Sequence, residues 1–180
     1  MPRTARAAVG GIVYHVLNRG NGRIGVFRKP GDYLAFLQLL LDGKTKAQIE
    51  LFGFCLMPNH WHLVLRPKGD RDLAGYLSWV TNTHVKRYRA HYRRTSGHLY
   101  QGRYKSFPVE DDVYFRTLMR YVEANPLKAK LVDHAQDWQW SSFRHHATGV
   151  EGAVEIESHW TAFRRGNLLP ETFRNQEEAG

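Results

Sequence analysis

One stretch decides the fold of this chain: Met57-Pro58-Asn59-His60-Trp61-His62-Leu63-Val64-Leu65. Its tryptophan, leucine and valine content predicts a buried strand, and its Pro-Asn start is typical of a turn. Side chains alternate between the faces of a strand, so His60 and His62 should point one way and Trp61 the other. Two neutral imidazoles so placed can hold one divalent metal ion, although histidines on half-buried strands are often hydrogen-bonded structural residues.

The apolar runs around this stretch predict the order of the other elements. Residues 11–18 are β-branched and aromatic and end at a glycine-rich turn, which indicates a first strand. A stripe with helical spacing in residues 33–41 predicts a helix, and residues 49–57 and 60–66 predict a hairpin. Further along come a long helix that begins at Asp70 or Asp72, a strand within residues 97–109, and a helix that ends before Pro126.

The order strand, helix, strand, strand, helix, strand, helix is that of the split βαβ, or ferredoxin-like, fold. We therefore expect an α+β domain with an antiparallel sheet and helices packed on one face. Its first and third strands are central neighbours, and the last helix lays Tyr121 over the histidine pair. The domain should span residues 1–148, and residues 149–180, where the composition turns more acidic and less apolar, should form a C-terminal tail of unknown role.

The composition favours a nucleic-acid partner. Lys and Arg outnumber Asp and Glu by 26 to 17, the net charge is +9, and 13% of residues are aromatic, which suits phosphate contacts and base stacking. The single cysteine, Cys55, excludes an internal disulfide and a cysteine-rich zinc site. No apolar run predicts a signal peptide or a membrane span, so we expect a cytoplasmic protein with no membrane partner.

Two basic and aromatic stretches are candidate DNA contacts. The first is the end of the long helix, where cations fall on one stripe; the alternative there is a solvated face that complements the helix dipole. The second is the strand within residues 97–109, where Arg103 and Lys105 should share a face. The residues expected to bind DNA are Lys86, Arg89, Arg93, Arg94, Arg103, Tyr104 and Lys105.

Tyr121 and Asn125 project from the same side of the last helix, one turn apart. Alone they would be a packed tyrosine and a helix-end residue. Together with His60 and His62 they suit cleavage of a phosphodiester by a covalent route, in which Tyr121 attacks while a metal held by the histidines and plausibly Asn125 polarises the phosphate. A phenol with a pKa of about 10 needs a nearby metal, cation or base to react, and the sequence identifies no base.

Four stretches, in order, resemble the single-tyrosine HUH transposases and, among them, the REP-associated tyrosine transposases of bacteria. They are Met57–His62, residues 97–106, Tyr121–Pro126 and Trp140–Phe143. The resemblance implies that His60 and His62 hold Mg²⁺ or Mn²⁺, and that Tyr121 forms a 5′-phosphotyrosine with single-stranded DNA, often beside a hairpin. Asn125 matches the position of a further ligand in relatives, whereas Glu123 stands where many relatives carry histidine, so either is a candidate third ligand.

Three questions stay open at this level. Some members of the family are dimers with shared active sites and others are monomers, so a homodimer is one alternative. An RNA-recognition-like module could use the same sheet to stack bases without any reaction, but it gives no reason for His60, His62, Tyr121 and Asn125 to occur together. A metal hydrolase that activates water would have a thin ligand set here, and would survive Tyr121→Phe.

Overall fold

A four-stranded antiparallel sheet forms the centre of the computed structural model, which describes residues 8–94 and 96–148. The strands are β1 (Tyr14–Arg19), β2 (Ile49–Met57), β3 (His60–Pro67) and β4 (Lys105–Pro108), in the order β2-β3-β1-β4. The central strands are therefore β1 and β3, and β2 and β3 form the expected hairpin. The tail predicted for residues 149–180 lies outside the described residues.

The main helices begin at the residues that favour a helix start. They are α1 (Pro30–Lys44), α2 (Asp72–His91) and α3 (Asp112–Glu123), followed by the short α4 (Asn125–Lys128) and α5 (Phe143–Thr148). Two 3₁₀ turns, η1 (Asn21–Arg23) and η2 (Ala135–Asp137), complete the set. Pro30 occupies the first turn of α1, and the Asp111 carboxylate accepts a hydrogen bond from the Tyr114 backbone N–H at the start of α3. None of the helices within the described residues is long and apolar enough to cross a membrane.

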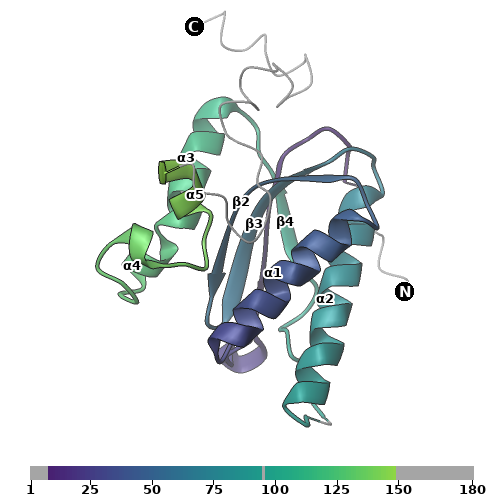
Figure 1. Cartoon of the computed structure of the whole chain (residues 1–180). Coiled ribbons are helices and arrows are strands. Elements are labelled where there is room, and N and C mark those ends of the chain that lie inside the picture. Colours follow the sequence, from purple (N-terminus) through teal and green to yellow (C-terminus); the bar gives the residue numbers. More distant parts are fainter. Residues whose placement is uncertain (1–7, 95, 149–180) are drawn as a thin grey trace, which may run out of the picture.

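Helices cover both faces of the sheet (Figure 1). Trp61, Leu63 and Leu65 of β3 point into a core with α1 and α2, whereas Val64 points into a second core with α3. The α+β class and the ferredoxin-like strand order are confirmed. The expectation that all helices pack on one face is wrong, because α3 packs on the face opposite to α1 and α2. The physical reason is that β2 and β3 are apolar on both faces, so both faces require cover.

The strand β4 is shorter than the sequence suggested. It begins at Lys105, so Arg103 lies before the strand and does not share a strand face with Lys105. Residues upstream pair with the sheet separately, through a bridge between Gly20 and Tyr100. Tyr104 packs towards the α1–α2 core. Lys105 pairs with Leu17, which pairs with His62, so Lys105 lies on the opposite face.

Trp61 fixes the orientation of β3. Its Nε1–H donates a hydrogen bond of 2.9 Å to the Tyr100 hydroxyl, which lies 2.6 Å from Nδ1 of His84 on α2. Burial lowers the pKa of His84 to about 4, so the ring is neutral and its Nδ1 can accept a hydrogen bond from the Tyr100 hydroxyl. This buried network on the α1–α2 face commits His60 and His62 to the α3 face, as strand alternation predicted.

Candidate active site

Three histidines from the two central strands meet on the α3 face. In the β1–β3 register, Leu17 lies opposite His62 and Arg19 opposite His60. His15 is two residues from Leu17, so it shares this face. Its Nε2 lies 2.9 Å from Nδ1 of His62, and the two rings are stacked with centroids 5.2 Å apart. His15 was not among the residues predicted from the sequence, although alternation along β1 combined with the strand pairing identifies it.

Hydrogen bonds engage the Nδ1 atom of both candidate metal ligands. His62 Nδ1 pairs with His15, and His60 Nδ1 lies 2.6 Å from the Asn59 side-chain oxygen, to which it donates. His60 can therefore offer Nε2 to a metal, and His62 can do so in the tautomer in which its Nδ1–H donates to His15 Nε2. Histidines that bind metals commonly use their other ring nitrogen in this way, which sets the tautomer and orients the ring.

Burial keeps these imidazoles neutral. It lowers the pKa of His62 to about 3, and His15 and His60, when protonated, and the Arg19 guanidinium act in the same direction. The pKa of His60 falls to about 4, again through burial and then through Arg19, and that of His15 falls to about 4 through burial. At neutral pH each ring therefore has a lone pair for a metal or a hydrogen bond.

Tyr121 lies over the histidines, as the topology predicted. Its ring centroid is 5.9 Å from that of His62 and 6.4 Å from that of His15, with an edge-to-face geometry in both cases. The side chain is 42% exposed, so a substrate can reach it. The Lys128 ammonium lies 4.9 Å from the ring centroid. This cation comes from α4 and was not among the residues predicted from the sequence.

Asn125 and Glu123, the alternative third ligands, have different surroundings. The Asn125 amide nitrogen donates to the Tyr121 and Val122 carbonyls and caps α3, which leaves its oxygen to act as a ligand. The buried Glu123 carboxylate instead accepts hydrogen bonds from Ser142 and His146. Among the described residues, no three His, Cys, Asp or Glu side chains cluster as metal ligands, so a metal on His60 and His62 would need the Asn125 amide, substrate oxygens or water.

Cations flank this face at its β4 edge and at the end of β1. Lys105 lies opposite Leu17, which in turn lies opposite His62, so all three share one face and one level of the sheet. Arg19 lies opposite His60 at the end of β1, and its side chain is exposed. The expected role of Lys105 near DNA is compatible with this position. Arg19 lies outside the predicted DNA-binding stretches and is an additional cation on this face.

The basic end of α2 lies on the other side of the sheet. Lys86, Arg89, Arg93 and Arg94 are exposed there. Arg89 donates to the Gly97 carbonyl at 2.6 Å. The structure does not bring these side chains together with Tyr121, because α2 packs on the face opposite to α3. They form a separate candidate surface for DNA.

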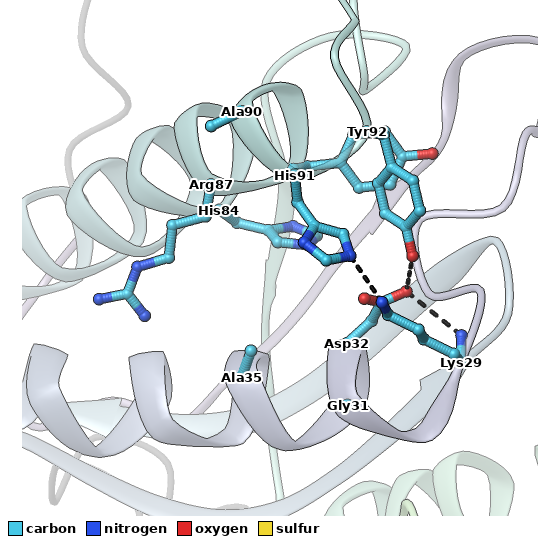
Figure 2. Close-up of a pocket in the computed structure, with 10 residues that line it drawn as sticks. Lys29, Gly31, Asp32, Ala35, His84, Arg87, Ala90, His91 and Tyr92 are labelled. Carbon is cyan, nitrogen blue, oxygen red and sulfur yellow. Dashed lines mark hydrogen bonds between the residues drawn. The ribbon is translucent and has the colours of Figure 1, made fainter.

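A pocket of about 650 Å³ lies between the start of α1 and the end of α2 (Figure 2). Lys29 Nζ is 2.6 Å from Nε2 of His91, and the Tyr92 hydroxyl donates to Asp32 at the same distance. The Arg28 guanidinium stacks over the Tyr92 ring. Lys29, Arg28 and Tyr92 at this helix junction already have partners within the protein.

The fold and the site define a class: a ferredoxin-like domain in which a helix-borne tyrosine faces a histidine pair on a central strand. Comparison with known proteins gives the family, since residues 8–125 match the model of the IS200-like transposases. The chain belongs to this family. The expectation that it is a transposase is thereby confirmed.

Two relatives carry the same identification. A Haemophilus influenzae protein whose name places it among the REP-associated tyrosine transposases is 26% identical over 147 residues, which cover 65% of this chain and 82% of that protein. The solved structure of a REP-associated tyrosine transposase bound to a REP hairpin has a TM-score of 0.66 at 19% identity, and covers 88% of this chain and 93% of that one. The resemblance inferred from the four motifs is confirmed, and the second comparison supports the fold.

Proposed function

We propose that the protein is a metal-dependent endonuclease and strand transferase that cleaves and rejoins single-stranded DNA through a 5′-phosphotyrosine. The observation that carries this proposal is the placement of Tyr121, whose exposed ring lies 5.9 Å from the His62 ring on the face where the histidines can offer Nε2. A nucleophile and a candidate metal site thus face the same open surface.

Each residue has a distinct role in this reaction. His60, His62 and the Asn125 oxygen would hold Mg²⁺ or Mn²⁺, and the two imidazole nitrogens favour Mn²⁺ because Mg²⁺ prefers oxygen ligands. When bound, the ion supplies Lewis-acid stabilisation of the phosphate. His15 orients His62 through the Nδ1 hydrogen bond. Lys128 places a positive charge beside Tyr121, where the anionic phosphate must approach.

The chemical step exchanges one phosphodiester for another. The Tyr121 oxygen bonds to the phosphorus and loses its proton to solvent, the bond from phosphorus to the 3′ oxygen breaks, and a 3′-hydroxyl leaves after taking up a proton. The DNA fragment whose 5′ end carries the phosphate stays covalently bound to Tyr121. A 3′-hydroxyl can then attack the phosphotyrosine and restore Tyr121, so strands are joined without a nucleotide cofactor.

A DNA hairpin is the partner that we propose. The solved relative binds a REP hairpin, and this chain carries a net charge of +9 with exposed cations on both sides of its sheet. The set at the end of α2 and the set beside Tyr121 would let one DNA molecule place its duplex and its single strand on different surfaces.

The decisive experiment is a search for the covalent intermediate. Purified protein is incubated with labelled single-stranded hairpin DNA and Mn²⁺, and denaturing electrophoresis reveals any adduct. We expect an adduct with the wild type, none with a chelator, and none with Tyr121→Phe. Tyr114→Phe is the matched control, because Tyr114 is on the same helix and is 41% exposed.

Two results would overturn the proposal. Tight binding without an adduct across a broad hairpin library would indicate a non-catalytic binding module. Metal-dependent cleavage that survives Tyr121→Phe would indicate a hydrolase that activates water.

A further inference from the structure

A second pocket opens directly beside His60. Its volume is about 590 Å³, within the range of about 300–1,000 Å³ in which proteins bind small molecules and nucleotides. The walls come from the end of β1, the η1 turn, the β2–β3 turn and the segment after α4. The polar lining residues are Arg19, Arg23, Asn59 and His60.

The charge of this pocket is positive and unbalanced. Arg19 and Arg23 are both exposed, and no aspartate or glutamate is among the lining residues. Within the described part of the chain, neither guanidinium forms a salt bridge. Two guanidiniums that line one pocket without a carboxylate make that pocket favourable for an anion.

The backbone holds Arg23 in an unusual conformation. Its φ is +62°, in the left-handed region that residues with a Cβ rarely adopt. The Arg23 N–H donates to the Gly20 carbonyl at 3.0 Å, and the Asn59 side-chain nitrogen donates to the Arg23 carbonyl at 3.5 Å. Local strain of this kind gathers at functional sites, where surrounding contacts maintain it.

Asn59 couples the pocket to the candidate active site. Its side-chain oxygen accepts the hydrogen bond from His60 Nδ1, while its nitrogen contacts Arg23. One amide therefore contacts both the ring that would bind a metal and the loop that carries an arginine. His60 lines the pocket and shares a strand face with His62, beside which Tyr121 lies.

We propose that this arginine pocket, formed by Arg19, Arg23 and Asn59 beside His60, binds the phosphodiester next to the scissile one in single-stranded DNA. The inference rests on the proposed function, which puts the scissile phosphate at His60, His62 and Tyr121. A strand in that position must continue past His60, where the two guanidiniums offer the paired donors that suit a phosphate. Arg19 and Arg23 act as positioning residues that set which bond meets Tyr121.

The test combines protein variants with DNA in which single phosphates are replaced by neutral methylphosphonates. Binding is measured in chelator, with a hairpin oligonucleotide that carries a single-stranded tail, for the wild type and for Arg19→Gln/Arg23→Gln. Arg71→Gln is the control, because Arg71 is exposed and follows the end of β3 opposite to His60. Arg19→Lys/Arg23→Lys retains the charge but loses the paired donors.

We expect the wild type to lose about tenfold in affinity when the phosphate beside the cleavage position is neutralised, about the effect of one charge-assisted contact. The double glutamine variant should bind the natural DNA about as weakly and show no further loss with that methylphosphonate. The slope of the logarithm of its DNA affinity against the logarithm of salt concentration, here called the salt slope, should fall in magnitude by about 0.7 for each arginine removed. The double lysine variant should recover the salt slope but only part of the affinity.

Two results would overturn the inference. In the first, the double glutamine variant loses as much affinity as the wild type with every methylphosphonate. In the second, Arg71→Gln weakens DNA binding as much as the double glutamine variant does. Adduct formation by the wild type on the same oligonucleotide, measured with Mn²⁺, reports separately on the proposed function. If the adduct forms but the double glutamine variant and the methylphosphonate weaken binding independently, only the role of the arginine pocket is rejected. Absence of an adduct rejects the proposed function and the placement of this phosphate beside the cleavage position.

Discussion

The two faces of the sheet use buried histidines for different purposes. On the α1–α2 face, His84 accepts a hydrogen bond from Tyr100, which receives one from Trp61, and these side chains are enclosed in the core. On the α3 face, His62 is also buried, but it lies beside His60 and the exposed ring of Tyr121. Burial lowers the histidine pKa on both faces. A lowered pKa is therefore not what identifies the site.

The neighbours of each histidine make the difference. The partners of His84 are hydrogen-bonding and aromatic side chains that complete a core. The partners of His62 include a second imidazole with an available nitrogen and a tyrosine that substrate can reach. We therefore expect changes on the α3 face to affect chemistry, and changes on the α1–α2 face to affect stability.

The largest expected effect is that of His60→Ala/His62→Ala. Loss of the metal ligands should remove several kcal/mol of transition-state stabilisation, or about a thousandfold or more in nicking rate. DNA binding in chelator should be largely retained, because neither ring carries a charge at neutral pH. The control is His134→Ala, an exposed position. Loss of binding by a folded double variant would contradict this division of roles.

His15→Ala should weaken metal binding by about 10–100-fold, which is typical of the loss of a residue that orients a metal-bound histidine. Titration of Mn²⁺ by calorimetry measures this directly. His15→Gln can offer an oxygen to His62 Nδ1–H and should recover part of the affinity. Unchanged metal affinity in His15→Ala would mean that His15 only fills space between β1 and α3.

On the α1–α2 face, Tyr100→Phe should have the opposite effect to His15→Ala: it should lower stability and leave metal affinity unchanged. The buried Trp61 N–H and His84 Nδ1 would both lose their partner, at a cost of about 1–3 kcal/mol in the free energy of unfolding. Urea denaturation in chelator measures the loss, and Mn²⁺ affinity should be unchanged at a temperature where the variant is folded. A large loss of metal affinity without a loss of stability would break the contrast between the faces.

Acid should destabilise the fold through the histidines. The folded-state pKa values of His15, His60 and His62 lie at about 3 to 4, below the unfolded value of about 6.5. As pH falls below 6.5, the unfolded chain takes up protons that the folded chain does not, so the free energy of unfolding decreases towards pH 4. Urea denaturation at pH 7, 6 and 5 in chelator should show this, and His15→Gln should flatten the dependence.

The smallest expected effect separates Lys105 from Arg103. Each change to glutamine should weaken DNA binding and reduce the salt slope by about 0.7. Only Lys105→Gln should also slow nicking at saturating DNA, because Lys105 shares a face with His62 whereas Arg103 lies before β4. Equal slowing by both variants would show that strand position does not decide their roles.

The residues most accessible to sequence analysis were those with local patterns. Strand alternation correctly separated Trp61 from His60 and His62, and the order of the elements correctly placed the helix with Tyr121 over them. The prediction that Arg103 shares a strand face with Lys105 was wrong, because β4 begins only at Lys105 and the chain around Gly102 and Arg103 is not part of the strand. The sequence did not show that the Glu123 carboxylate accepts hydrogen bonds from Ser142 and His146.

The sequence by itself determined the strand order, the two faces of β3 and the transposase family, because each depends on periodicity or on motifs along the chain. Only the tertiary structure decided that His15 supports His62, that Lys128 lies beside Tyr121, and that Arg19 and Arg23 share a pocket with His60. These contacts join segments far apart in the chain. They depend on strand register and helix docking, which local patterns do not specify.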